Sequence, residues 1–162
     1  MKHTISLVAE NKLGAAVRII GLFSSRGFNL DSISVGESEE KDLYRMTLVT
    51  QGDDAIIEQI TKQLNKLIDV VKVSDLTLDN FIERELVLIK VSSNATTRPE
   101  IMQIVNVFRG KIVDISPRTL TVEATGTEDK VNAIISMLRP FGLKEVARTG
   151  HVALKREFQG ET

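Results

Sequence analysis

Hydrophobic and polar positions along the first half of the chain predict four strands and two helices. Ile5 and Leu7 alternate with polar or smaller neighbours, as in a half-buried strand. After Asp53, apolar side chains recur every three or four positions, as on one face of an amphipathic helix. The charged run 37–42 separates two strands and predicts a solvated hairpin. In order, we predict a strand at 3–10, a helix at 14–26, strands at 29–36 and 43–51, a helix at 53–68 and a strand at 70–76.

The second half of the chain predicts the same order of elements without obvious sequence similarity to the first. The run 86–89 is apolar on both faces, as in a central strand. Thr127 is a suitable N-cap for a helix, and Pro140 a suitable stop. We predict a strand at 85–92, a helix at 98–108, strands at 111–116 and 119–125, a helix at 128–139, and strands at 143–148 and 152–155 around Gly150.

Two successive βαββαβ units predict an α+β protein with two ferredoxin-like domains, each an antiparallel sheet with two helices on one face. We place the first domain at residues 1–77 and the second at 78–162, joined near 77–82. Each domain is small enough to be marginally stable alone. An open sheet also leaves edge strands that favour pairing with another chain. Both properties predict a dimer.

Composition narrows the class of protein and of partner. Apolar residues make up 42% of the 162 positions and aromatic residues only 4%, so aliphatic side chains must build the cores. The formal net charge is −1, which offers no basic excess for nucleic acid or an anionic membrane. We find no window of 18 consecutive apolar residues and no signal peptide, and the chain has no cysteine. A cytoplasmic protein is expected.

The segment 10–36 is the strongest candidate for binding a small zwitterion. Asn11 is expected to cap the helix that follows, and Gly14 lets the backbone come close to a ligand. The first N–H groups of that helix, around Gly14, Ala15 and Ala16, favour a carboxylate. Asn11 and Asn29 each carry an amide whose oxygen can accept from an ammonium group. The alternative is an ordinary capped helix in a βαβ unit.

Residues suited to catalysis do not form a constellation. His3 and His151 are far apart in sequence and lack a metal-ligand pattern around them. Glu39 and Glu40 lie in the predicted hairpin, where an acid–base pair would be poorly held. We find no nucleophile elbow, phosphate loop or dinucleotide fingerprint. We therefore predict no catalytic residue and no metal site in this chain.

Several motifs together carry a family resemblance. In the first half they are Glu10-Asn11-x-x-Gly14-x-x-x-Arg18, Gly21-Leu22-Phe23-Ser24 and Arg26-Gly27-Phe28-Asn29-Leu30. In the second half they include Phe108-Arg109, Ile112-Val113-Asp114 and Arg148-Thr149-Gly150. In order and spacing these motifs resemble the small regulatory subunit of acetolactate synthase, also called acetohydroxyacid synthase, which begins with an ACT domain. The resemblance extends over the full chain.

The resemblance implies a non-catalytic subunit of branched-chain amino acid biosynthesis. Its partner would be the large catalytic subunit, which condenses two pyruvates and carries thiamine diphosphate, Mg²⁺ and FAD, with no cofactor in the small subunit. The small subunit would raise that activity and confer feedback inhibition, with valine as the first choice of effector. ACT domains of the family pair side by side as a homodimer. Carried over, Asn11, Gly14, Ala15 and Ala16 would bind the effector from one chain, and Asn29 and Leu30 from the other.

The sequence departs from the family pattern at two positions of this site. Ala16 stands where leucine is frequent, and Leu13 where proline or a small residue is frequent, which leaves the choice of effector open. Two other functions remain possible at this stage. One is a free-standing ACT-type sensor that acts on another enzyme or regulator, although no helix-turn-helix segment is evident. The other is an acylphosphatase-type hydrolase, which needs an arginine beside its anion loop, and the segment 11–14 has none adjacent.

Overall fold

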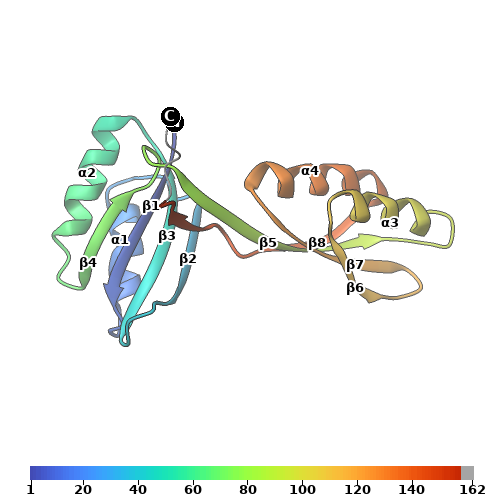
Figure 1. The fold of residues 1–162 in the computed structure, drawn as a ribbon, viewed down its shortest axis with the longest axis horizontal. Helices are drawn as coiled ribbons and strands as arrows, with labels where there is room; N and C mark the ends of the chain where they lie inside the picture. The colour runs from blue at the N-terminus through green and yellow to red at the C-terminus, as the bar shows by residue number, and fades with distance from the viewer. Residues whose placement is uncertain (158–162) are drawn as a thin grey trace. The chain divides into compact units, whose positions relative to one another are not determined.

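The computed structural model describes residues 1–157, which form two compact units (Figure 1). The first unit contains Met1–Ile82 together with the segment that begins at His151. The second unit is Glu83–Gly150. Both are sheets covered by helices, so the predicted α+β class with two ferredoxin-like βαββαβ units is confirmed.

The first unit is a four-stranded antiparallel sheet with strand order β2-β3-β1-β4 and two helices. Its core joins alternate residues of β1, such as Ile5 and Leu7, to Phe23 of α1 and Ile60 of α2. The two outer strands, β2 and β4, are the edges that the open sheet was expected to leave. The bounds are β1 Lys2–Glu10, α1 Ala15–Ser25, β2 Ser32–Glu37, β3 Leu43–Gln51, α2 Asp54–Asn65 and β4 Val70–Asp75.

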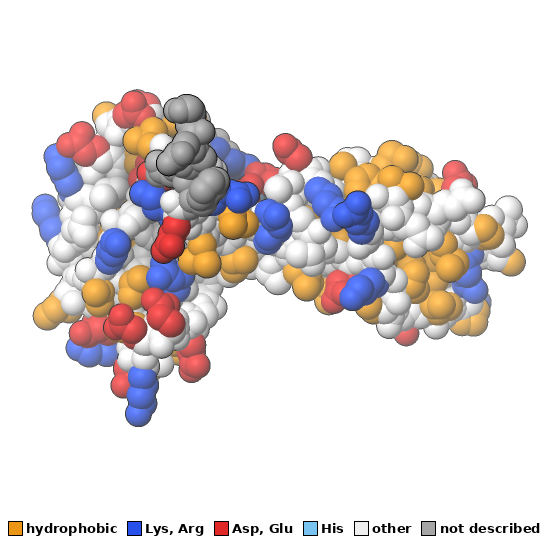
Figure 2. All heavy atoms as spheres, viewed as in Figure 1, with side chains coloured by type: hydrophobic (Ala, Val, Ile, Leu, Met, Phe, Trp, Pro, Cys, Tyr) orange, Lys and Arg blue, Asp and Glu red, His pale blue; other side chains and the backbone are white. Residues whose placement is uncertain are grey.

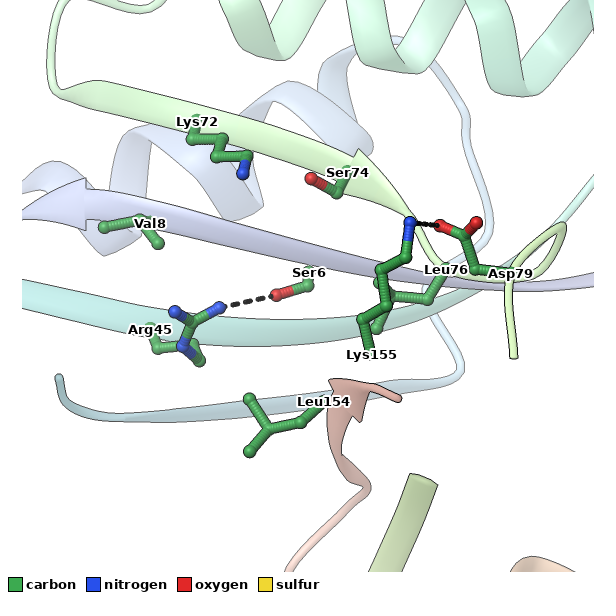
Figure 3. A pocket seen from close by; sticks show the side chains of 9 residues that line it. All are labelled: Ser6, Val8, Arg45, Lys72, Ser74, Leu76, Asp79, Leu154 and Lys155. Atoms are coloured by element: carbon green, nitrogen blue, oxygen red, sulfur yellow. Dashed lines mark hydrogen bonds and ion pairs between the residues drawn. The ribbon is translucent and has the colours of Figure 1, made fainter. Parts of the chain in front are cut away.

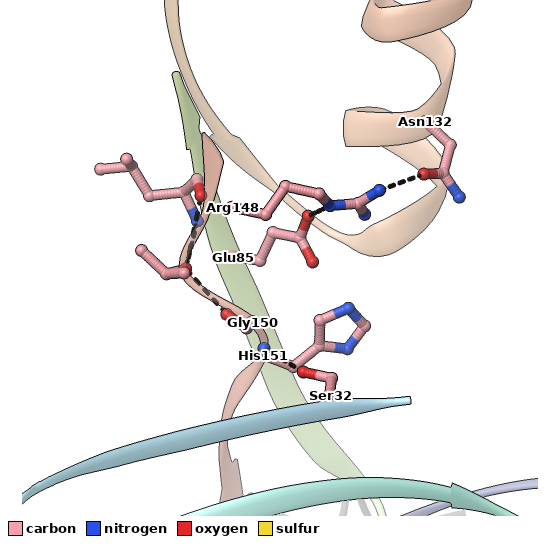
Figure 4. A network of polar contacts seen from close by, with 8 residues as sticks. Ser32, Glu85, Asn132, Arg148, Gly150 and His151 are labelled. Carbon is pink, nitrogen blue, oxygen red and sulfur yellow. Dashed lines mark hydrogen bonds and ion pairs between the residues drawn. The ribbon is translucent and has the colours of Figure 1, made fainter. Parts of the chain in front are cut away.

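The second unit repeats this architecture with strand order β6-β7-β5-β8. Val87, Ile89 and Val91 of the central strand β5 pack against buried residues of both helices. Glu85 is buried and pairs with Arg148, whose Nη1 also donates to Asn132 Oδ1 at 3.0 Å (Figure 4). The bounds are β5 Phe81–Ser92, α3 Arg98–Val107, β6 Lys111–Ile115, β7 Thr119–Gly126, α4 Glu128–Leu138, the 3₁₀ turn η1 Arg139–Phe141 and β8 Leu143–Arg148.

The end of the described chain returns to the first unit as strand β9, Val152–Lys155. It contacts β1 and β3 on the face of the sheet opposite the helices. Two backbone N–H groups hold the segment: that of His151 donates to Ser32 Oγ at 3.1 Å (Figure 4), and that of Arg156 donates to the carbonyl of Asn80 at 2.8 Å. The compact units therefore differ from the predicted division at 77/78, which placed all of 78–162 in one domain.

Most predicted elements agree with the structure to within a few residues, and two differences matter. The strand predicted at 29–36 begins only at Ser32, because residues 29–31 form a connecting loop in which the Asn29 carbonyl accepts from the Thr50 hydroxyl. The strand predicted at 85–92 begins at Phe81, so the predicted linker 77–82 ends inside β5. Within residues 1–157, no helix is long and apolar enough to cross a membrane.

Candidate functional site

The junction between β1 and α1 brings free backbone donors to the surface. After β1, the Lys12 N–H donates to the carbonyl of Glu10 at 2.8 Å, which turns the chain. Gly14 then takes a left-handed conformation, with φ of +82°, as the residue that precedes the helix. A side chain there would be strained, so this turn favours glycine. The N–H groups of Ala16 and Val17 have no acceptor among residues 1–157 and lie at the positive end of the helix dipole.

Two predicted roles at this junction are wrong. Asn11 does not cap α1, because the helix starts after Gly14 and receives no side-chain cap. Asn11 instead donates its backbone N–H to the carbonyl of Asp42 at 2.8 Å and leaves its exposed amide available. Ala15 does not offer a free N–H either, because that group donates to the carbonyl of Lys12 at 3.1 Å and the side chain is buried in the unit.

Arg18 is a site residue that sequence reasoning missed. Its Nη1 lies 3.0 Å from the position that a Cβ atom on Gly14 would occupy, so the guanidinium group lies beside the helix N-terminus. Its Nε and Nη2 donate to Asp69 Oδ2 at 2.7 and 2.5 Å. The Asp69 side chain is 5% exposed and that of Arg18 is 48% exposed. One edge of the guanidinium is thus held by a buried carboxylate, and Nη1 remains available to a ligand anion.

The four-residue spacing from Gly14 to Arg18 was the available signal, since side chains at this spacing lie over the preceding helical turn. The segment 11–14 has no arginine next to it in sequence, but the fold places the Arg18 guanidinium beside Gly14. Lys12 adds a second cation at the same junction. A hydrogen bond with Glu10, and then their Coulomb attraction, raise the pKa of the Lys12 ammonium group above its usual value. Both cations at this junction are paired with carboxylates, and Nη1 of Arg18 is the guanidinium nitrogen left without a partner among residues 1–157.

The second half of the predicted site, Asn29 and Leu30, lies at the other end of α1. The exposed Asn29 amide donates to the Asp31 carboxylate, which leaves its oxygen free to accept. Leu30 is partly buried against the core, so only part of its side chain can contact a ligand. The helix of 11 residues separates the two halves by about 16 Å. One chain alone therefore does not bring Gly14 and Asn29 together.

Between these two halves, α1 exposes an apolar stripe. Leu13 precedes the helix and is fully exposed, and Val17 and Ile20 are 73% and 40% exposed. Val35, on the neighbouring edge strand β2, is 44% exposed on the helix-covered side of the sheet. The face of the first unit that Figure 2 shows carries charged side chains of both signs, with apolar ones between them. The stripe and edge strand have the character of a protein-protein contact.

The remaining candidates for chemistry are structural. His3 is buried, and its Nδ1 lies 3.0 Å from Asp75 Oδ2. Its Nε2 has no hydrogen-bond partner among residues 1–157. His151 belongs to the segment that holds β9 to the first unit. The described residues contain no group of three side chains placed to hold a metal ion.

Comparison with known proteins gives the family of the chain. Residues 5–72 match a family model described as the AHAS small subunit-like ACT domain, and residues 84–157 match one described as the small subunit of acetolactate synthase. The acetolactate synthase small subunit of Aquifex aeolicus is 52% identical over 157 residues, which cover 96% of this chain and 82% of that protein. This chain belongs to the acetolactate synthase small-subunit family.

Further similarities extend over both units. The probable acetolactate synthase small subunit of Archaeoglobus fulgidus is 51% identical over 156 residues, 96% of this chain and 98% of its own. The crystal structure of the acetolactate synthase small subunit from Thermotoga maritima has a TM-score of 0.89 at 44% identity and covers 96% of this chain and 98% of that one. The predicted family, the small subunit of acetolactate synthase in branched-chain amino acid biosynthesis, is therefore confirmed.

Proposed function

We propose that this small subunit binds the large catalytic subunit of acetolactate synthase, raises its activity and makes it sensitive to valine or a related branched-chain amino acid. One observation supports the proposed response to an effector: two groups of candidate ligand residues, around Gly14 and Asn29, lie at opposite ends of α1, beside an exposed apolar stripe. Thiamine diphosphate, Mg²⁺ and FAD would reside on the catalytic subunit, and this chain would contribute no catalytic residue.

A homodimer would complete the effector site by bringing one chain's Gly14 to the other chain's Asn29. The effector carboxylate would accept from the N–H groups of Ala16 and Val17 and from Nη1 of Arg18. Its ammonium group would donate to the Asn29 amide oxygen of the second chain. The apolar side chain of the effector would lie against Leu13 and Val17, beside the small side chain of Ala16.

Direct assay of acetolactate formation tests the division of labour. With thiamine diphosphate, Mg²⁺ and pyruvate, the purified chain alone should form no acetolactate. Added to its catalytic subunit it should raise turnover, and valine should then reduce that turnover. Turnover by this chain alone would contradict the assignment. Activation that no branched-chain amino acid reverses would support the partner but not the effector, and a failure to bind the catalytic subunit would favour a free-standing sensor.

Replacement of Val35 by proline tests the proposed dimer contact. The Ser38 N–H donates to the Leu43 carbonyl, and hydrogen-bonded and non-hydrogen-bonded pairs alternate along β2 and β3, so the Val35 N–H points away from β3. Proline removes that edge donor without breaking the ladder inside the chain. We expect Val35→Pro to weaken dimerisation and valine affinity together, each by about tenfold or more, because binding and dimerisation are linked.

Sedimentation with and without valine, beside calorimetric titration, measures both effects. Val35→Thr is the matched control, because it keeps the N–H group and the β-branched shape and should retain the dimer. A Val35→Pro chain that is monomeric and still binds valine as the wild type does would place the whole pocket within one subunit.

A further inference from the structure

The first unit has a cavity on the face of the sheet opposite α1 and α2 (Figure 3). We call it the outer-face cavity. Its volume is about 210 Å³, which suits a small metabolite. Strands β1, β3 and β4 form its floor, and β9 closes one side. Its lining residues are Ser6, Val8, Arg45, Lys72, Ser74, Leu76, Asp79, Leu154 and Lys155.

The polar lining of the outer-face cavity is dominated by cations. Its lining contains three cations, Arg45, Lys72 and Lys155, and one carboxylate, Asp79. The Asp79 carboxylate lies 3.0 Å from the Lys155 ammonium nitrogen. Outside the lining, Glu39 lies 3.6 Å from Arg45 Nη2, and its side chain is 72% exposed. Lys72 has no ion-pair partner among residues 1–157. The cavity therefore carries an excess of positive charge that a ligand anion would balance.

A buried hydroxyl group supplies a directional donor. Ser6 is 6% exposed, and its Oγ accepts from Arg45 Nη1 at 3.2 Å (Figure 3). Because this oxygen already accepts a hydrogen bond, its own proton is free to point toward a ligand. A serine hydroxyl beside a partly engaged guanidinium group is a suitable pair of donors for one carboxylate.

The remaining lining is apolar and limits the size of the ligand. Val8 and the buried Leu76 belong to the sheet side, and Leu154 belongs to β9. A fully hydrated inorganic anion would leave these surfaces without a partner. A carboxylate attached to a short aliphatic group would satisfy both parts of the lining.

We propose that the outer-face cavity binds a small aliphatic carboxylate, held by Arg45, Ser6 and Lys72 and covered by Leu154. This site is separate from the proposed effector site at the N-terminus of α1, which lies on the helix-covered side of the sheet. Because Leu154 and Lys155 belong to β9 and the other ligand contacts belong to the sheet, the bound anion fastens β9 to the sheet. Binding and the docking of β9 therefore strengthen each other.

The test is titration of the ¹⁵N-labelled full chain with isobutyrate at about 0.15 M ionic strength, where unspecific surface attraction is screened. We expect saturable amide shifts at Ser6, Arg45, Lys72 and Lys155, with a dissociation constant of about 1 mM. Isobutyrate should also slow hydrogen exchange of the amides in β9. Shifts that spread over the surface, or that concentrate at the N-terminus of α1, would overturn the proposal.

Lys72→Met should weaken isobutyrate binding about tenfold, because it removes an unpaired cation from the lining. The matched control is Lys66→Met, which makes the same charge change at the end of α2, away from the cavity, and should leave the affinity unchanged. Equal losses in the two variants would show attraction by net charge alone and overturn the site.

Two further probes define the ligand class. Isobutylamine should not bind, because it carries an ammonium group in place of the carboxylate on the same isopropyl group. Inorganic phosphate should bind more weakly than isobutyrate, and tighter phosphate binding would overturn the assignment of a carboxylate.

Valine inhibition of the holoenzyme should be the same in Lys72→Met and in wild type, so failure of this proposal is distinguishable from failure of the proposed effector site.

Discussion

Replacement of Gly14 by aspartate is expected to reduce valine affinity about a hundredfold or more and to remove feedback inhibition. The new carboxylate would lie beside Arg18 Nη1 and the free N–H groups of α1, where the effector carboxylate is proposed to bind. It would satisfy these donors within the chain and repel the ligand. Loss of one charge-assisted hydrogen bond costs about 1.5–3 kcal/mol, and repulsion adds to that. Calorimetric titration and inhibition curves of the holoenzyme measure the effect.

Gly14→Ala separates charge from backbone strain. Both variants place a Cβ atom at φ of +82°, close to the flexible end of Arg18. Only aspartate adds a carboxylate, and aspartate tolerates the left-handed conformation better than alanine does. We expect Gly14→Ala to keep most of the valine response despite a small loss of stability. If a holoenzyme with the Gly14→Asp subunit is inhibited by valine as the wild type is, or if Gly14→Ala abolishes inhibition equally, the anion site is not at this end of α1.

Replacement of Arg18 by alanine is expected to destabilise the first unit by about 3 kcal/mol, because it leaves the buried Asp69 carboxylate without its partner. The melting temperature of this unit should fall by roughly 15 °C, which thermal unfolding followed by circular dichroism would show. Valine affinity should fall as well, since Nη1 of Arg18 is a proposed ligand donor. The Asp69 contact and the proposed ligand contact would therefore use different edges of one guanidinium group.

Arg26→Ala, at the C-terminal end of the same helix, is the matched control. Arg26 is exposed and donates to Gln63 Oε1 at 3.3 Å, so its loss should change stability by less than about 0.5 kcal/mol. A double variant combines Arg18→Ala with Asp69→Asn. The Asp69→Asn change removes the unpaired charge, so the double variant should recover part of the stability but not the valine affinity. An Arg18→Ala chain as stable as Arg26→Ala would contradict the account of the ion pair.

The bounds of several elements were predictable to the residue or nearly so. The predicted bounds of β3, β8 and β9 agree with the structure, and α3 differs by one residue. In β7 buried and less buried positions alternate, a local pattern that the sequence displays directly, and its predicted end differs by one residue. Cap and loop geometry was less predictable. Asn11 had a suitable side chain for a cap, but the left-handed turn at Gly14 places the helix start beyond its reach.

By itself the sequence determined the order of the elements, the α+β class and, through motif order and spacing, the family. These properties follow from local periodicity and from residues close together in the chain. Only the tertiary structure showed that Arg18 joins Asp69, a residue 51 positions away, while remaining beside Gly14. Only the tertiary structure returned β9 to the first unit and closed the outer-face cavity with Leu154. Such contacts depend on which distant surfaces bury each other, and no local pattern of hydrophobic and polar residues encodes that choice.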